Sequence, residues 1–120
     1  ALHNKSFTIY GNGKQTRSFC YYSDLIDGIV RLLYSGLHEP INIGNPAEFT
    51  ILEFADMVLK FSGAKSKLVY DPLPVDDPKQ RCPDITLAKK YLKWEPKVKL
   101  EDGLKETLAW FRTHRFSEEK

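Results

Sequence analysis

The chain has 120 residues, of which 42% are hydrophobic, and this size and composition fit one ordinary domain with a modest core. Its 18 Lys and Arg residues against 16 Asp and Glu leave a formal charge of +2, too small a surplus to indicate nucleic-acid binding. Cys20 and Cys82 lack the spacing of a disulfide framework or a zinc site, so we interpret both as reduced thiols. No apolar run approaches the roughly 20 residues of a membrane helix, and we expect a cytoplasmic protein.

The first third of the chain predicts two strands and a helix. Residues 7–10 are typical of a strand that ends in a glycine turn, and residues 18–22 are a second β-prone run. These two segments could approach each other as a hairpin. Apolar residues at helical spacing follow, with Ser23 or Asp24 as the expected N-cap and Gly36 as the expected stop.

The middle of the chain predicts a short extended segment and a second helix. Residues 41–43 are β-prone, and the glycine and proline that follow place Asn45 in a loop. Thr50 and Glu53 have the spacing of a capping box and precede an amphipathic stripe. Gly63 is the expected end of this helix.

The last part of the chain predicts one strand and two helices. Residues 68–70 are typical of a strand, and Asp84 is the expected cap of a short helix that packs Ile85, Ala88 and Leu92. A final helix starts near Leu100, presents Leu104, Leu108 and Phe111 on one side, and ends in a frayed tail at residues 117–120. The pattern is that of an α/β or α+β domain with short strands and about four helices.

A first candidate site lies in the glycine turn and polar string that follow the first strand. Glycines let a ligand approach the backbone, and the planar guanidinium of Arg17 suits phosphate, so this stretch could hold a phosphate group. A surface hairpin with an exposed arginine explains the same residues equally well. Tyr10 and Lys14 match a dehydrogenase spacing by coincidence, because Gly11 and Gly13 oppose a helix and form no dinucleotide fingerprint.

A second candidate site is the stretch at residues 76–84, which belongs to the proline-rich loop that begins at Pro72 and carries another guanidinium. Prolines lower the entropic cost of holding Arg81 against a ligand. The alternative, a solvated loop in which Arg81 pairs with Asp76 or Asp77, is favoured by local physics alone. No metal site is expected, because the histidines have no carboxylate or cysteine at ligand spacing: His3, His38 and His114.

An ordered series of strings resembles UDP-glucuronic acid decarboxylases of the extended short-chain dehydrogenase family. These strings are residues 7–13 (FTIYGNG), 15–19 (QTRSF), 42–46 (NIGNP), 77–85 (DPKQRCPDI) and 92–96 (LKWEP). The resemblance runs from end to end, and its only departure of note is Cys82, where these enzymes usually have a basic residue.

The resemblance implies that residues 1–120 form the carboxyl-terminal, nucleotide-sugar-binding lobe of such an enzyme. The amino-terminal Rossmann domain that binds NAD lies outside this chain. By the same analogy, Gln15 and Arg17 hold the diphosphate side of the substrate, and Arg81 reaches the phosphates or the sugar from the opposite loop. The full set of residues expected to contact a UDP-sugar is Thr8, Tyr10, Gly11, Gln15, Arg17, Asn45 and Arg81.

The resemblance also implies the chemistry of the complete enzyme. Such enzymes oxidise the sugar at C4 with bound NAD, lose the C5 carboxylate as carbon dioxide, and reduce C4 again. The family's catalytic Tyr-x-x-x-Lys helix does not occur here, so we expect no bound cofactor and no turnover by this chain alone. We expect a homodimer for the full-length protein and self-association of this chain through uncovered apolar surface.

Other interpretations of the chain differ in class. It could be part of a dTDP-glucose 4,6-dehydratase or a UDP-sugar 4-epimerase, whose tails are similar. It could also be a non-catalytic UDP-sugar-binding module or a structural interaction domain. Nucleic-acid binding is disfavoured, because a basic stripe with interleaved aromatic residues is not found.

Overall fold

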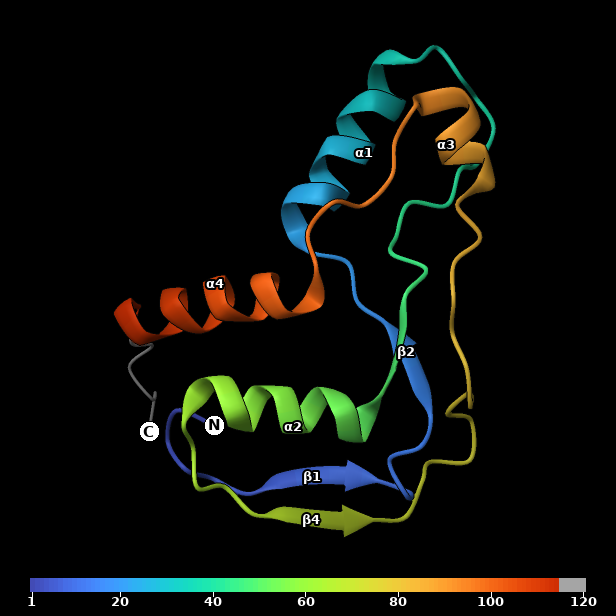
Figure 1. Cartoon of the computed structure of the whole chain (residues 1–120). Coiled ribbons are helices and arrows are strands. Elements are labelled where there is room, and N and C mark those ends of the chain that lie inside the picture. Colours follow the sequence, from blue (N-terminus) through green and yellow to red (C-terminus); the bar gives the residue numbers. More distant parts are fainter. Residues whose placement is uncertain (115–120) are drawn as a thin grey trace.

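The computed structural model describes residues 1–114, which form two unequal parts joined by extended chain (Figure 1). In the larger part α2 packs on β1 and α4 packs on α2, and in the smaller part α1 packs on α3. The elements in chain order are β1 Phe7–Tyr10, β2 Thr16–Ser18, α1 Tyr22–Tyr34, β3 Glu48–Thr50, α2 Ile51–Ser62, β4 Leu68–Asp71, α3 Thr86–Leu92 and α4 Leu100–Thr113. The mixed class, the short strands and the four helices agree with the prediction for this part of the chain.

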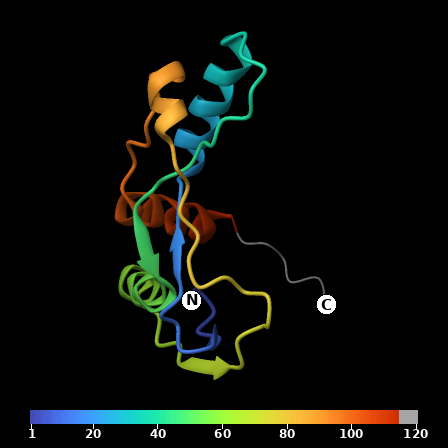
Figure 2. The same cartoon turned by 90° about the vertical axis from the view of Figure 1, so that its right-hand side faces the viewer.

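The strands form two separate pairs. β1 pairs with β4 in parallel, with Ile9 opposite Tyr70, and β2 pairs with β3 in antiparallel orientation between the two parts of the molecule (Figure 2). The predicted hairpin is therefore wrong, and within residues 18–22 only Ser18 belongs to a strand. The cause lies in the core: Ile9 is 3% exposed beneath α2, and the chain that leaves this helix returns beside β1 as a parallel crossover.

Helix α2 begins and ends where the sequence predicts. The Thr50 hydroxyl accepts the N–H of Glu53 at 3.1 Å, and the Glu53 carboxylate accepts the N–H of Thr50 at 2.7 Å. Hydrogen bonds from the Thr50 backbone and hydroxyl lower the pKa of Glu53. Gly63 ends the helix with a left-handed φ of 70°. The capping box and the stop are both confirmed.

Helix α1 begins without the predicted cap. Its N-cap is Tyr21, whose side chain makes no capping hydrogen bond, and Ser23 and Asp24 both lie inside the first turn. The Asp24 carboxylate is buried and faces the segment before α4 instead. Its Oδ2 accepts the N–H groups of Lys97 at 3.0 Å and Val98 at 2.8 Å. A tertiary contact has taken the place of a local cap.

The core of the smaller part forms between α1, α3 and the chain on either side of them. Trp94 is 2% exposed, and its indole N–H donates to the backbone oxygen of Asp24 at 3.0 Å. The predicted packing of α3 is confirmed, since its apolar residues belong to this cluster: Ile85, Ala88, Leu92 and Trp94, with Leu32, Ile41 and Ile43 against them. The helix's N-cap is Ile85 rather than the predicted Asp84, whose carboxylate nevertheless accepts the N–H of Thr86 at 2.9 Å.

Close packing in this core requires a glycine on α1. A Cβ atom at Gly28 would lie 2.5 Å from Ile43 Cγ2 and 3.1 Å from Trp94 Cε2. The predicted extended segment at residues 41–43 belongs to no strand of the structure and instead packs its two isoleucines here. The helix can approach that segment only because position 28 carries no side chain.

Helix α4 starts at Leu100 as predicted, but its predicted apolar side is only partly buried. Leu108 is 8% exposed, whereas Phe111 is 43% exposed and packs edge-to-face on Trp110. Arg112 donates from Nη2 to the backbone oxygen of Ser62 at 3.1 Å and so joins the ends of α4 and α2. The predicted frayed tail at residues 117–120 lies outside the described residues.

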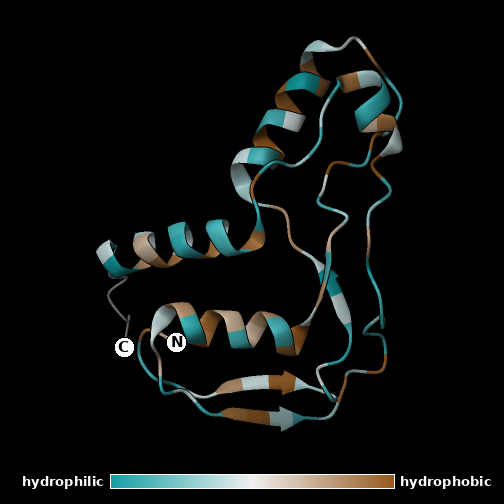
Figure 3. Ribbon diagram, viewed as in Figure 1, coloured by the Kyte–Doolittle hydropathy of each residue, from teal (hydrophilic) through white to brown (hydrophobic). Residues whose placement is uncertain are grey.

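One face of α1 is apolar and uncovered. Figure 3 shows hydrophobic residues recurring along this helix. Six large apolar or aromatic side chains of α1 are at least 45% exposed: Tyr22, Ile26, Ile29, Val30, Leu33 and Tyr34. Among residues 1–114, no helix has both the length and the hydropathy required to cross a bilayer.

Candidate functional site

A cavity of about 410 Å³ lies at the end of β1, between β2 and the proline-rich loop. Four of the seven residues predicted to bind a nucleotide sugar line it, namely Thr8, Tyr10, Gln15 and Arg17. The remaining lining residues are Ile51, Pro74, Asp76 and Asp77. The fold therefore brings β1, the polar string after it and the later loop to one place.

Strand alternation explains how β1 presents its residues to this cavity. Side chains point to opposite faces along a strand, so Ile9 enters the core under α2 while Thr8 and Tyr10 face outward. The strand ends at Tyr10. Gly11 follows, and its φ of 66° starts the turn while its N–H donates to the backbone oxygen of Asp71 at 2.8 Å. The exposed face of β1 is thus available to a ligand.

Gln15 is a buried polar residue that holds the turn in shape. It is 8% exposed, and its Nε2 donates to the backbone oxygen of Tyr10 at 2.8 Å. The backbone oxygens of Gln15 and Gly13 accept the N–H groups of Ile51 and Leu52, each at 3.1 Å. These bonds occupy the first donors of α2, so the end of this helix offers no free N–H pair there to an anion.

Arg17 is already partnered inside the cavity. Its Nη2 lies 2.5 Å from Asp77 Oδ1, its Nη1 donates to the backbone oxygen of Thr16 at 2.7 Å, and its side chain is only 19% exposed. An exposed arginine on a surface hairpin is therefore the wrong description. The alternative pairing of Arg81 with Asp76 or Asp77 is not found among residues 1–114, where Asp77 pairs with Arg17 instead.

The loop that carries Arg81 runs beside β2. The N–H of Thr16 donates to the backbone oxygen of Lys79 at 2.9 Å, and the hydroxyl of Ser18 donates to the backbone oxygen of Arg81 at 3.1 Å. Arg17 and Arg81 therefore lie on neighbouring stretches of backbone, although 64 positions separate them in the sequence. The Arg81 side chain is exposed and does not line the Arg17 cavity.

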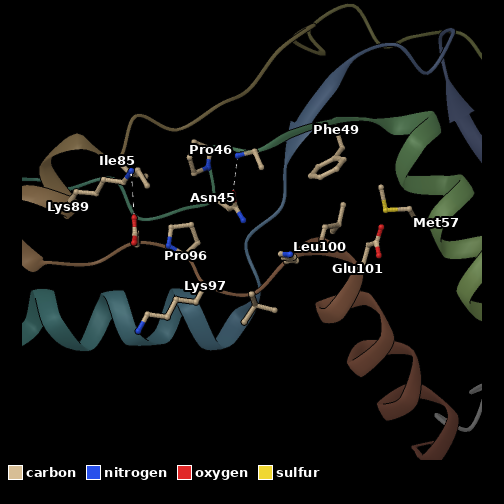
Figure 4. A pocket seen from close by; sticks show the side chains of 14 residues that line it. Asn45, Pro46, Phe49, Met57, Ile85, Lys89, Pro96, Lys97, Leu100 and Glu101 are labelled. Atoms are coloured by element: carbon tan, nitrogen blue, oxygen red, sulfur yellow. Dashed lines mark hydrogen bonds and ion pairs between the residues drawn. The ribbon is translucent and has the colours of Figure 1, made fainter.

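Asn45 lies in a different and larger cavity of about 580 Å³ (Figure 4). Its Oδ1 accepts the N–H of Ala47 at 2.9 Å, so part of its amide stabilises its own turn. Around it, Figure 4 places Phe49, Met57 and the start of α4 at one side and Lys89 at the other. The structure therefore separates Asn45 from the residues around Arg17.

Sequence reasoning did not identify Asp77 as the partner of Arg17, nor Lys79 as a neighbour of β2. The sequence did point to Asp77 as an ion-pair partner, but it was considered for Arg81, which is nearer to it in the sequence than Arg17 is. Within residues 1–114, no three His, Cys, Asp or Glu side chains are grouped as a metal site.

The glycine turn does not fit NAD. A dinucleotide loop leads into a helix that receives the pyrophosphate, whereas the chain after Gly13 leads into β2. A Cβ atom at Gly13 would lie 2.5 Å from Leu52 Cγ, so this glycine serves close packing on α2. This turn is therefore not a dinucleotide-binding loop.

Curated relatives of this chain are UDP-glucuronic acid decarboxylases. The decarboxylase 1 of Danio rerio is 47% identical over 111 residues, which are 92% of this chain and 27% of that protein. The decarboxylase 4 of Arabidopsis thaliana is 46% identical over 120 residues, which are 100% of this chain and 27% of that protein. The chain thus spans about a quarter of the length of these relatives.

Two solved structures of similar fold are epimerases. UDP-glucose 4-epimerase of Thermotoga maritima, determined with UDP-glucose, has a TM-score of 0.88 and 32% identity over 93% of this chain and 36% of its own. UDP-glucuronic acid 4-epimerase of Bacillus cereus, in complex with UDP-glucuronic acid and NAD, has a TM-score of 0.86 and 35% identity over 93% of this chain and 37% of its own. The predicted α/β lobe of an extended short-chain dehydrogenase is confirmed by these likenesses.

The family assignment rests on most of the chain. The sequence profile described as GDP-mannose 4,6 dehydratase matches residues 1–107, which include both candidate loops and the start of α4. Together with the identity to the decarboxylases, this match confirms the resemblance seen in the sequence. The chain belongs to the GDP-mannose 4,6-dehydratase family of proteins.

Proposed function

We propose that this chain is the carboxyl-terminal, nucleotide-sugar-binding part of an NAD-dependent UDP-glucuronate decarboxylase that makes UDP-xylose. The observation that carries the proposal is the identity of 44% to 49% to eight decarboxylases over 87% or more of the chain. The solved epimerases that share the fold are less similar in sequence, at 32% and 35% identity. A decarboxylase therefore remains the first choice over an epimerase or a dehydratase.

The site proposed for the substrate is the cavity at the end of β1. The outward face of Thr8 and Tyr10 and the turn at Gly11 offer a surface along which a nucleotide can lie. Gln15 and Arg17 follow at the diphosphate side, and the exposed Arg81 approaches from the neighbouring loop. For Asn45, which lines the separate cavity, we propose an indirect role in the same substrate site.

Activity belongs to the complete protein in this proposal. The protein expressed from its whole coding sequence is expected to release carbon dioxide from UDP-glucuronate with NAD. Parallel assays with dTDP-glucose and with UDP-glucose separate the decarboxylase from a dehydratase and an epimerase. Preferred turnover of either alternative substrate would contradict the choice of member. The isolated chain is expected to be inactive, and enzyme-dependent carbon dioxide release by its 120 residues would refute that expectation.

Binding can be tested apart from turnover. Replacing Arg17 by glutamine removes a charged donor, so the dissociation constant for UDP should rise about tenfold or more by calorimetry. Arg31→Gln is the matched control, because Arg31 lies on α1 in an exposed ion pair with Asp27. If both variants bind UDP equally well, the phosphate role of Arg17 is wrong.

The uncovered face of α1 leads us to propose that this chain self-associates when it is studied alone. Contiguous apolar surface of this kind usually marks a contact with other protein. Leu33→Glu, at a position 73% exposed, should shift sedimentation toward the monomer, whereas a wild-type chain that is already monomeric at high concentration would contradict the proposal. For the complete protein we propose a homodimer, measurable by the same method.

We also propose a cytoplasmic location. Cys20 and Cys82 are free thiols in the structure, which fits a reducing compartment. Burial, and then the nearby Asp24 carboxylate, raise the pKa of the Cys20 thiol and reduce its reactivity. Cell fractionation of the complete protein tests the location.

A further inference from the structure

A cleft of about 450 Å³ lies next to the Arg17 cavity and shares Gln15 with it. Its lining residues are Gly11, Asn12, Lys14, Gln15, Leu73 and Lys79. We propose that Lys14 and Lys79 form a second anion site in this cleft, which takes a phosphate group and is distinct from the predicted position at Arg17.

The two cavities differ in charge. The Arg17 cavity contains one guanidinium and the two carboxylates of Asp76 and Asp77, a formal charge of −1 from three charged side chains. The neighbouring cleft is lined by the exposed residues Lys14 and Lys79 and by no acidic residue, a formal charge of +2. A phosphate entering the first must displace Asp77 from Arg17, whereas in the second it meets uncompensated positive charge.

The backbone at both lysines is held in place. The carbonyl groups on either side of Lys14 accept the first N–H groups of α2, and the N–H of Lys14 itself donates to Asn12 Oδ1 at 3.0 Å. The carbonyl of Lys79 accepts the N–H of Thr16 at 2.9 Å, which fastens the proline-rich loop to β2. Two segments distant in sequence thus bring their lysines to one cleft through fixed backbone rather than through mobile loops.

In the part of the chain that the structure describes, the surroundings of the cleft leave the two lysines without an acidic partner. The amino-terminal end of α2 faces the turn that carries Lys14, but its first N–H groups and the Glu53 carboxylate are already engaged in capping hydrogen bonds. The nearby carboxylate of Glu48 does not line the cleft and is held by the Thr16 hydroxyl and the Gln80 amide, each at 2.8 Å. Within residues 1–114, neither lysine has an ion-pair partner. A phosphate group would supply the missing negative charge.

The test uses inorganic pyrophosphate as the probe on this chain in a low-salt buffer, followed by calorimetry or by amide chemical shifts. In the double variant Lys14→Gln, Lys79→Gln, the dissociation constant for pyrophosphate should rise roughly fivefold or more. The matched control is Lys65→Gln, Lys67→Gln, which removes the same net charge at the opposite end of β4 and should change binding less than about twofold. Circular dichroism of both variants checks that the fold is retained.

Equal weakening in the two double variants would show a diffuse charge effect and overturn the proposal, as would an absence of saturable pyrophosphate binding to the wild-type chain. Competition with UDP tests whether the two sites are separate. Simultaneous binding of pyrophosphate and UDP supports a second anion site, whereas mutual exclusion would overturn its separation from the substrate's diphosphate. The site is independent of the UDP position tested by Arg17→Gln, so either proposal can fail while the other stands.

Discussion

Replacement of Asp24 by alanine removes the carboxylate that joins α1 to the segment leading into α4. Asp24 is 7% exposed, and its Oδ2 accepts the N–H groups of Lys97 at 3.0 Å and Val98 at 2.8 Å. In the alanine variant, the N–H groups of Lys97 and Val98 both lose this acceptor. A buried donor that loses its partner costs about 1–3 kcal/mol, and both N–H groups are only partly buried, so the expected loss is about 2–4 kcal/mol in the free energy of unfolding.

A loss of that size is a large fraction of the free energy of unfolding of a typical domain, which is about 5–15 kcal/mol. Urea denaturation followed by circular dichroism should therefore show a clearly lower midpoint with a similar dependence on denaturant. Asp24→Asn keeps one oxygen acceptor without the charge and should fall between alanine and the wild type.

The control for this prediction lies on the same helix. Asp27 is exposed and forms an i,i+4 ion pair with Arg31 at 3.0 Å, so Asp27→Ala should cost only about 0.5 kcal/mol. If Asp24→Ala destabilises the chain no more than Asp27→Ala does, the carboxylate does not hold the two segments together and the reasoning is refuted.

Three further changes test other contacts. Asp77→Asn should release Arg17 and lower the dissociation constant for UDP several-fold by calorimetry. The control Asp76→Asn removes the same charge without breaking that ion pair, so it should lower the dissociation constant much less. Equal effects of the two variants would contradict a specific role of the Arg17–Asp77 pair. Gly28→Ala should cost about 1–3 kcal/mol in chemical denaturation, because the added methyl group overlaps core side chains, and a neutral result would show that α1 shifts freely. The folded state lowers the pKa of Glu53, so its capping contribution is present above the unfolded pKa and is lost as pH falls through the folded pKa. The stability of Glu53→Gln should therefore fall less steeply than that of the wild type over this acid range, and parallel pH curves would count against the capping box as the cause.

Local signals in the sequence were sufficient for most of the elements. The capping box of Thr50 and Glu53 and the stop at Gly63 appear in the structure as predicted, because each depends on hydrogen bonds and dihedral angles within a few residues. The apolar spacing of α3 likewise predicted its buried side. The family resemblance, carried by ordered strings along the chain, predicted the fold class.

Partners distant in the sequence could not be predicted from local pattern. Asp24 has the composition of a helix cap, yet its acceptor oxygen is used by backbone 73 and 74 positions away. Arg17 has the composition of a free phosphate ligand, yet it is paired with Asp77, 60 positions away. Such contacts depend on the path of the chain through α2, which also replaced the expected hairpin by the parallel pair of β1 and β4.

The sequence by itself therefore determined the family, the helices and the residue types available to an anionic ligand. Only the tertiary structure decided that Arg17 shares a cavity with carboxylates, that Asn45 lies apart from it, and that Lys14 and Lys79 meet in one cleft. The physical reason is the distance along the chain over which each effect acts. Helix propensity and capping depend on residues a few positions apart. The net charge of a cavity depends on side chains from distant segments, which only folding brings together.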